Sequence, residues 1–359
     1  MQNEIKTDIL SLSYDELESF VINELGEAKY RAGQIFENIH RGTPPSDITS
    51  LSKALRQKLC ERCEYKMPHI ERKLVSAIDG TVKYLFRLTD GNCIESVVMR
   101  YNHGNTICIS SQVGCRMGCR FCASTIGGRV RNLEPSELLS QVIAAQKDMG
   151  ERISNIVMMG IGEPLDNFDN VVKFLLLVGE ERGLNIGYRH ISLSSCGIVD
   201  KIYRLAELRL PITLSISLHA PDDETRSAIM PINNKWGVDA LLRACADYYK
   251  STRRRISFEY TLIAGKNDSK ERAEKLASVL NGALRSKSDT MPIHVNLIPV
   301  NEVEETGFKR SGDREIKEFA AVLEKRGIRA TVRRKLGSDI NASCGQLRRE
   351  EMKDKEENN

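Results

Sequence analysis

Three cysteines stand close together in one short run of the chain. Cys115, Cys119 and Cys122 follow the spacing C-x-x-x-C-x-x-C, so a single loop offers three thiolates to a metal site. A cubane [4Fe-4S] cluster normally takes one cysteine for each of its four irons. A loop with three cysteines therefore leaves one iron open to bind another molecule, which favours chemistry at the cluster over simple electron storage.

A structural zinc site is the alternative interpretation of this loop, with Cys108 as a fourth ligand. Structural zinc sites usually combine two C-x-x-C-like pairs, and residues 115–122 do not follow that pattern. The spacing, with the aromatic Phe121 before the third cysteine, resembles the radical S-adenosylmethionine (SAM) superfamily. This resemblance implies that the open iron binds the amino and carboxylate groups of SAM. It also implies that an electron from the cluster cleaves SAM to a 5′-deoxyadenosyl radical.

The composition predicts a folded, cytoplasmic protein. The chain has 359 residues, 41% of them hydrophobic, which is enough for one large domain and an appendage. No run approaches the roughly 18 apolar residues of a membrane span, and the start lacks the apolar core of a signal peptide. Ten cysteines in such a chain indicate reduced thiols, metal ligands or catalytic groups rather than a disulfide framework. The net charge of +4 is compatible with nucleic acid but does not identify that partner.

Residues 1–104 are expected to form two appendages. Residues 1–65 carry helical patterns, including a capping box at Ser13 to Glu16 and an amphipathic run over 47–59, and predict a helical accessory domain. Over residues 66–104 the hydrophobic period changes to two. Strands are expected over 74–78, 82–88 and 94–99, with turns at Asp79-Gly80 and Asp90-Gly91, so this extension is predicted to be a β-meander.

The core, residues 105–347, alternates short β-rich runs with helix-length segments. Strands are expected over 106–110, 155–159, 190–194, 212–218, 256–262 and 294–298, and helices over 135–147, 171–179, 238–250, 270–280 and 314–326. Six consecutive βα units predict an α/β fold, a partial (β/α)6 barrel, although an open doubly wound sheet would give a similar pattern. Residues 348–359 are nearly all charged or polar and are expected to be a disordered tail.

Glycines and polar residues gather where these strands end. Barrel enzymes build their sites at the carboxyl ends of their strands, and the three-cysteine loop follows the first strand. Glycine lets a backbone approach a ligand, and polar side chains offer hydrogen bonds to amino, carboxylate and ribose groups. Taken alone, the segment 160–163 is equally well a strand-to-helix turn, and His219 a buried core residue. The candidates at the other strand ends are Gly162, Glu163, Ser194, Ser217, Leu218, His219 and Asn301.

Over residues 10–348 the chain resembles a family of dual-specificity RNA methyltransferases. The segments that carry the resemblance are 108–115, 131–133, 160–165, 217–220, 230–233, 294–298 and 339–347. The family methylates carbon 2 of one adenosine in 23S ribosomal RNA and of the adenosine beside the anticodon in certain tRNAs. A related class methylates carbon 8 of the same ribosomal adenosine, confers antibiotic resistance, and is the alternative. Pro164, where that class tends to carry alanine, and the segment 339–343 favour carbon 2.

The resemblance implies a role for each candidate residue. Cys115, Cys119 and Cys122 would hold the [4Fe-4S] cluster, and the seven strand-end candidates would bind SAM. One SAM would methylate Cys344, and the adenosyl radical from a second would take hydrogen from the S-methyl group. The carbon radical would add to adenine, and Cys108 would resolve the RNA adduct as a transient disulfide forms with Cys344. Glu95 matches the position of the proton acceptor.

The chemistry of adenine explains why such a route needs two further cysteines. Carbon 2 is electron-poor, so it is a poor nucleophile toward the sulfonium methyl group of SAM. A thiolate is an excellent nucleophile, so Cys344 is easily methylated, and a carbon radical derived from it attacks the ring. Outside this family context, Cys108 would be a small buried residue of a strand and Glu95 an ordinary exposed one. Cys60 and Cys63 form a C-x-x-C without a visible partner pair.

The expected partners are 23S ribosomal RNA, tRNA and an electron donor such as flavodoxin or ferredoxin, and the expected state is a monomer. The basic run 333–335, close to Cys344, is a better candidate for RNA phosphates than the run 253–255, which can equally be a solvated surface. A zinc-stabilised RNA-binding protein without catalysis is the competing class. It predicts a colourless protein that does not consume SAM, whereas the enzyme hypothesis predicts a brown iron–sulfur protein.

Overall fold

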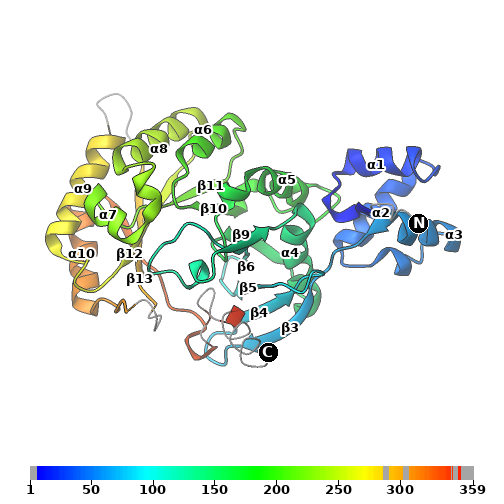
Figure 1. The fold of residues 1–359 in the computed structure, drawn as a ribbon, viewed down its shortest axis with the longest axis horizontal. Coiled ribbons are helices and arrows are strands. Elements are labelled where there is room, and N and C mark those ends of the chain that lie inside the picture. Colours follow the sequence, from blue (N-terminus) through cyan, green and yellow to red (C-terminus); the bar gives the residue numbers. More distant parts are fainter. Residues whose placement is uncertain (1–5, 286–290, 302–306, 341, 343–346, 349–359) are drawn as a thin grey trace.

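The computed structural model describes residues 6–285, 291–301, 307–340, 342 and 347–348 (Figure 1). A helical lobe at the N-terminus stands apart from a large sheet with its covering helices, and a C-terminal segment returns to the first strands of that sheet. Within this part of the chain, no helix has the length and apolar character needed to cross a membrane.

The N-terminal lobe contains α1 (Tyr14–Asn23), α2 (Tyr30–His40) and α3 (Lys53–Arg62), and the short strands β1 (Thr7–Asp8) and β2 (Cys63–Glu64) pair in parallel beside them. The predicted capping box is confirmed: Ser13 Oγ accepts from Glu16 N, and the Glu16 carboxylate accepts from Ser13 N. The third helix begins at Lys53 rather than at residue 47. The reason is that Ser52 caps it, while Pro45–Asp47 forms a separate 3-10 turn.

His40 lies where the lobe meets the core. Its ring stacks on Phe36 with 3.9 Å between ring centroids, and it closely approaches Gly183, because a β-carbon there would lie 3.0 Å from His40 Cδ2. His40 Nδ1 donates to Phe36 O at 2.9 Å, and its buried Nε2 has no partner among the described residues. Burial lowers the pKa of His40 from 6.5 to about 4.

Acid is therefore expected to destabilise the protein through His40. The pKa of His40 is lower in the folded protein than the 6.5 of the unfolded chain, so acid protonates the unfolded chain first. The free energy of unfolding is therefore unaffected by His40 above pH 6.5 and decreases as the pH falls toward about 4. At about pH 5 the expected loss is about 2 kcal/mol. Urea unfolding measures this loss when the natural protein and His40→Leu are each compared near neutrality and near pH 5. The other buried histidines affect both proteins equally, so identical pH dependence in the two would contradict the assignment.

The first three strands of the large sheet form a β-meander. It consists of β3 (His69–Val75), β4 (Val82–Arg87) and β5 (Cys93–Met99), paired antiparallel, with Gly80 and Gly91 at positive φ in the two turns. The first strand lies earlier than the predicted 74–78. Ser76 ends it, because its hydroxyl accepts from Ile78 N and Asp79 N and turns the chain there.

The remaining strands run parallel and follow one another across the sheet in chain order. They are β6 (Asn105–Cys108), β9 (Ile153–Met158), β10 (Ile191–Ser195), β11 (Thr213–Ser217), β12 (Ile256–Leu262), β13 (Ile293–Pro299) and β14 (Arg329–Val332). A doubly wound sheet would reverse its strand order at one point, and this order does not reverse, so the predicted α/β barrel-type fold is confirmed. The six predicted strands are present. The seventh, β14, was not predicted because it is short and mostly exposed.

The helices of the core cover the outside of these strands (Figure 1). They are α4 (Pro135–Met149), α5 (Phe168–Gly179), α6 (Val199–Glu207), α7 (Asp223–Ile229), α8 (Val238–Thr252), α9 (Lys270–Leu284) and α10 (Asp313–Lys325). The five predicted helices are confirmed to within a few residues at each end. The prediction lacked α6 and α7. In α7 the buried residues are Arg226 and Ile229, and an arginine at a buried position hides the apolar period of a helix.

Candidate active site

The predicted strand-end residues lie along one edge of the parallel sheet. Cys108 ends β6, Ser217 ends β11, and Asn301 follows β13, so these residues share the side on which parallel strands end. Ser194 is half-buried near the end of β10, and Asn301 is exposed. The structure thus brings the candidates to one side of the sheet, and their contacts with SAM stay a prediction.

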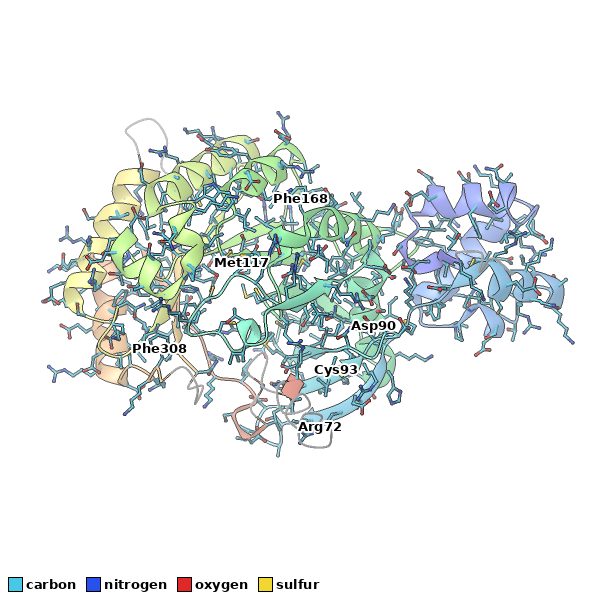
Figure 2. The ribbon with its side chains drawn as sticks, in the orientation of Figure 1. Arg72, Asp90, Cys93, Met117, Phe168 and Phe308 are labelled. Atoms are coloured by element: carbon cyan, nitrogen blue, oxygen red, sulfur yellow. The ribbon has the colours of Figure 1, made fainter. Side chains whose placement is uncertain are left out.

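The three-cysteine loop is the loop of a short hairpin. Strands β7 (Gln112–Gly114) and β8 (Arg129–Asn132) pair antiparallel, and the loop between them carries all three cysteines and Met117, labelled in Figure 2. Cys115 N donates to Gly128 O at 3.0 Å, which closes the base of the loop. At its far side Arg120 N donates to Ile229 O, the last residue of α7, at 2.9 Å. Backbone hydrogen bonds therefore hold the loop both at its base and at its far side.

The three thiols lie close enough to influence one another. Burial, with a smaller contribution from the neighbouring cysteines, raises the pKa of Cys115 to about 12 and the pKa of Cys119 well above its usual range. Three mutually repelling thiolates are the donor set that an iron–sulfur cluster neutralises. Among the described residues, no group of three His, Cys, Asp or Glu side chains is arranged to hold a metal ion. Cysteines of a cubane bind different irons and do not converge on one point, so the loop fits a cluster.

Asp166 ties the cluster loop to the segment that follows β9, and sequence reasoning missed it. Its carboxylate accepts from Arg116 Nε at 3.0 Å, from Arg129 Nη1 at 3.0 Å and from Gln112 Nε2 at 2.9 Å. Burial alone would raise the pKa of Asp166, but these donors, Arg116 first, outweigh it and lower the pKa. Because Gln112 and Arg129 flank the cysteines and Arg116 lies among them, Asp166 fixes the hairpin as one unit.

Glu163 lies directly behind this hairpin. It is buried, and its carboxylate accepts from Leu165 N at 3.0 Å and from Cys196 N at 2.7 Å, while burial raises its pKa. The glycines beside it serve close packing of the chain on itself. A β-carbon on Gly160 would lie 2.6 Å from Ile109 O, and one on Gly162, at φ +107°, would lie 2.7 Å from Gln112 N. The structure therefore places the strand-to-helix turn against the hairpin, and SAM binding by this segment stays a prediction.

His219 contacts the cluster loop from the end of β11. It is buried at φ +56°, and its Nδ1 accepts from Thr261 N at 2.9 Å, so the ring proton is on Nε2. Its ring meets Phe121 edge-on, with 4.9 Å between centroids. Burial lowers the pKa of His219 to about 3, which keeps the ring neutral. His219 is thus a hydrogen-bonded core histidine that also borders the loop.

Arg226 holds the ends of β10 and β11 together. Its guanidinium is fully buried and donates to the carbonyls of Cys196, Ser217 and Leu218 at 2.7 to 3.0 Å and to the Asn233 side chain at 3.0 Å. Burial lowers the pKa of Arg226, and the nearby thiols of Cys196 and Cys119 act in the opposite direction. A buried cation beside the cysteine loop favours negative charge there.

Cys108 and Glu95 share one face of the sheet. Cys108 pairs directly with Val97, which stands two residues after Glu95 on β5, so the side chains of all three lie on the same face. Glu95 is buried rather than exposed, and its Oε2 lies 3.2 Å from the ammonium of Lys83. Cys108 packs in an apolar cluster with Val97 and Met99. The structure thus brings together two residues whose proposed roles concern the RNA adduct.

The C-terminal segment returns to this face. The Asp339 carboxylate accepts from Ser76 Oγ at 2.7 Å and from Ala77 N at 2.9 Å, and Asp79 accepts from Gly337 N at 2.8 Å. Farther along, Leu347 packs with Leu85 and Cys93, and Arg348 N donates to Glu95 Oε1 at 2.7 Å. Arg348, expected to begin a disordered tail, is therefore part of the folded protein. Cys344 itself lies outside the described residues.

The cysteines without an expected role are distributed through the fold. No disulfide joins two of the nine cysteines that the structure describes. Cys60 is exposed on α3, and burial raises the pKa of its neighbour Cys63 to about 12. Cys196 and Cys245 are buried.

Comparison with known proteins places these observations in a family. Residues 109–277, which include the cluster loop, match the model of the radical SAM superfamily. Residues 7–65 match the model of the ribosomal RNA large subunit methyltransferase N-terminal domain. A probable dual-specificity RNA methyltransferase RlmN from Lachnospira eligens is 53% identical over 353 residues, 98% of each chain. The chain belongs to the RlmN family.

Other members agree over nearly the same length. A probable dual-specificity RNA methyltransferase RlmN from Clostridium novyi is 52% identical and covers 95% of this chain and 98% of its own. The crystal structure of a radical SAM methyltransferase from Sphaerobacter thermophilus superposes with a TM-score of 0.88 at 40% identity, over 95% of this chain and 98% of that one. Family and fold class are thus confirmed. Glu95, Cys108, Asn301 and Cys344 lie outside the ranges of the two family models, and the roles of all the candidate residues stay predictions.

Proposed function

We propose that this protein is a radical SAM methyltransferase that methylates carbon 2 of adenosine in 23S ribosomal RNA and in tRNA, through an S-methyl intermediate on Cys344. The names of its relatives support the substrate class. The observation that carries the mechanism is the shared face of Cys108 and Glu95, to which the described residues on both sides of Cys344 return. This convergence of a cysteine, a carboxylate and the C-terminal segment favours catalysis over RNA binding alone.

The cluster and SAM would occupy the carboxyl ends of the strands. When bound, the [4Fe-4S] cluster supplies the electron that cleaves SAM to a 5′-deoxyadenosyl radical. Cys115, Cys119 and Cys122 hold the cluster in this proposal, and the buried Arg226 offsets its negative charge. The residues proposed to hold SAM are Gly162, Glu163, Ser194, Ser217, Leu218, His219 and Asn301.

Three residues then carry the methyl group to RNA. The Cys344 thiolate takes a methyl group from one SAM. The S-methyl group then loses a hydrogen atom to the radical, and its carbon forms a bond with carbon 2 of the ring. The unpaired electron that this addition leaves on the ring would pass to a one-electron acceptor, a role that the oxidised cluster can fill. Glu95 takes the proton that leaves carbon 2. Cys108 attacks the Cys344 sulfur, which releases the RNA and leaves a disulfide between the two cysteines. Ala342, two residues before Cys344, packs against the cluster that contains Cys108, and two residues span at most about 7 Å.

Methylation of carbon 8 is the alternative. The printed names of the relatives favour the carbon 2 enzymes. Pro164 opens the 3-10 helix Pro164–Asn167, where a proline at the first position needs no amide hydrogen bond. Asp339, in the other segment that favours carbon 2, binds the turn after β3.

The partners and the division of the chain follow from this proposal. The accessory domain 1–65 and the β-meander 66–104 would help to grip structured RNA for the core 105–347. The cations of Arg333, Arg334 and Lys335 follow β14 and are exposed, as contacts with RNA phosphates require. A flavodoxin or ferredoxin would reduce the cluster, and the enzyme would work as a monomer in the cytoplasm.

Nucleoside mass spectrometry tests the function. Protein reconstituted anaerobically with iron and sulfide, then given SAM, a reductant and ribosomal or transfer RNA, should yield 2-methyladenosine. Cys344→Ala should give neither product nor methylated protein, and Cys108→Ala should accumulate a covalent protein–RNA adduct. Cys60→Ala, which changes an exposed cysteine, is the control and should behave like the natural protein. Formation of 8-methyladenosine alone would replace the proposal with the alternative, and a colourless zinc protein without iron would overturn it.

A further inference from the structure

Lys83 forms a buried ion pair with Glu95. The lysine side chain is fully buried, its carboxylate partner is 3% exposed, and 3.2 Å separates Lys83 Nζ from Glu95 Oε2. Lysine is rarely buried completely, and replacing a buried ion pair with apolar residues is often neutral or stabilising. The other members of β4 around it, Val82, Tyr84 and Leu85, are buried residues of the core. Stability alone therefore gives no reason for a lysine at this position.

The strand register places Lys83 on the face that carries Cys108. Lys83 pairs directly with Val97, and Val97 pairs directly with Cys108, so the three residues form one row across β4, β5 and β6. Directly paired residues share a face, and neighbouring strands lie about 4.8 Å apart. Lys83 and Cys108 are thus about 10 Å apart in this row. The ammonium lies on the face to which the C-terminal segment returns.

Glu95 is held from two sides. Oε2 meets the Lys83 ammonium, and Oε1 accepts from Arg348 N at 2.7 Å. Among the described residues, the Arg348 side chain also acts on this carboxylate, and Cys93 lies two residues earlier on the same face. Glu163 offers a contrast within the same protein. It is equally buried but is held by backbone amides, and burial raises its pKa.

We infer that Lys83 is a positioning residue for proton transfer at Glu95: its ammonium binds one oxygen of the buried carboxylate and so fixes the orientation of the group. The inference rests on the proposed function of Glu95. In that step the C–H bond at carbon 2 of adenine breaks, its proton goes to a Glu95 oxygen, and its electron pair stays with the ring.

The test removes the charge but keeps the length of the side chain. Lys83→Met should methylate Cys344 as the natural protein does, since that reaction does not use Glu95. With RNA present, it should form the covalent adduct but release 2-methyladenosine about 100-fold more slowly, the usual contribution of a positioned proton acceptor. Lys83→Arg keeps a cation and should recover most of that rate. Intact-protein mass spectrometry follows Cys344 methylation, and a denaturing gel follows the adduct.

A double substitution shows whether Lys83 acts only through Glu95. Lys83→Met combined with Glu95→Gln leaves no lone buried charge, so it stays folded, and it should release product at the same slow rate as Glu95→Gln alone. The inference would be overturned if the double variant released product more slowly than Glu95→Gln alone, or if Lys83→Met released it at the natural rate. Either result would leave the proposed function intact. Absence of methylated Cys344 in the natural protein would instead overturn the proposed function itself, and this inference with it.

Discussion

Alanine in place of Gly114 is expected to prevent assembly of the cluster site. Gly114 stands directly before Cys115 at φ +77°, and a β-carbon there would lie 2.0 Å from Gly128 O. That oxygen is the acceptor of Cys115 N, so the hairpin must separate at the base of the loop that carries the cysteines. Overpacking of this kind costs about 1–3 kcal/mol, and a non-glycine residue at positive φ about 1 kcal/mol more.

The measurement is iron bound per protein after anaerobic reconstitution, which should fall about tenfold or more, since 1.4 kcal/mol is a factor of ten. Gly128→Ala is the matched control. Gly128 also has positive φ, at +68°, but nothing lies within 4 Å of its β-carbon position, so only the smaller backbone cost applies. Equal loss of iron in both variants would show that the contact between Gly114 and Gly128 O is not the cause.

Methionine in place of Arg226 is expected to cause the largest loss of stability. The guanidinium is fully buried and satisfies the carbonyls of Cys196, Ser217 and Leu218 at the ends of two neighbouring strands. Each buried acceptor left without a donor costs about 1–3 kcal/mol. We expect the free energy of unfolding of the iron-free protein to fall by about 4 kcal/mol, since the site relaxes in part. Urea unfolding measures this change.

Arg226→Lys tests whether the positive charge alone is enough or whether the shape of the guanidinium group is needed. A lysine keeps the positive charge but lacks the planar fork that reaches several carbonyls at once, so its stability should lie between those of the natural protein and Arg226→Met. Arg243→Met removes an exposed arginine of α8 that pairs with Asp239 one turn earlier. It should change stability little, because exposed ion pairs contribute little. If Arg226→Met unfolds at the same urea concentration as this control, the assignment of Arg226 is wrong.

The features that depend on local pattern could be predicted from the amino-acid sequence. The spacing of Cys115, Cys119 and Cys122 lies within one loop, so their joint chemistry was visible without a fold. The alternation of strands and helices predicted the parallel sheet, and each candidate at a strand end was found there because parallel strands must end on the same side. The capping box at Ser13 was equally local.

Only the tertiary structure decided which charged residues are buried and what they meet. Lys83 and Glu95 are 12 residues apart and come together through strand register, while Asp339 meets Ser76 across 263 residues. From the sequence, Arg226 in α7 and Asp166 in a turn resemble ordinary surface residues. In the fold, the strand ends bury Arg226, and the cysteine hairpin contacts Asp166. A charge is stable in the interior only with partners from other elements, and no local pattern records such partners. The cysteine loop could be recognised from its sequence, but the ionic and hydrogen-bonded surroundings that hold it became visible only in the fold.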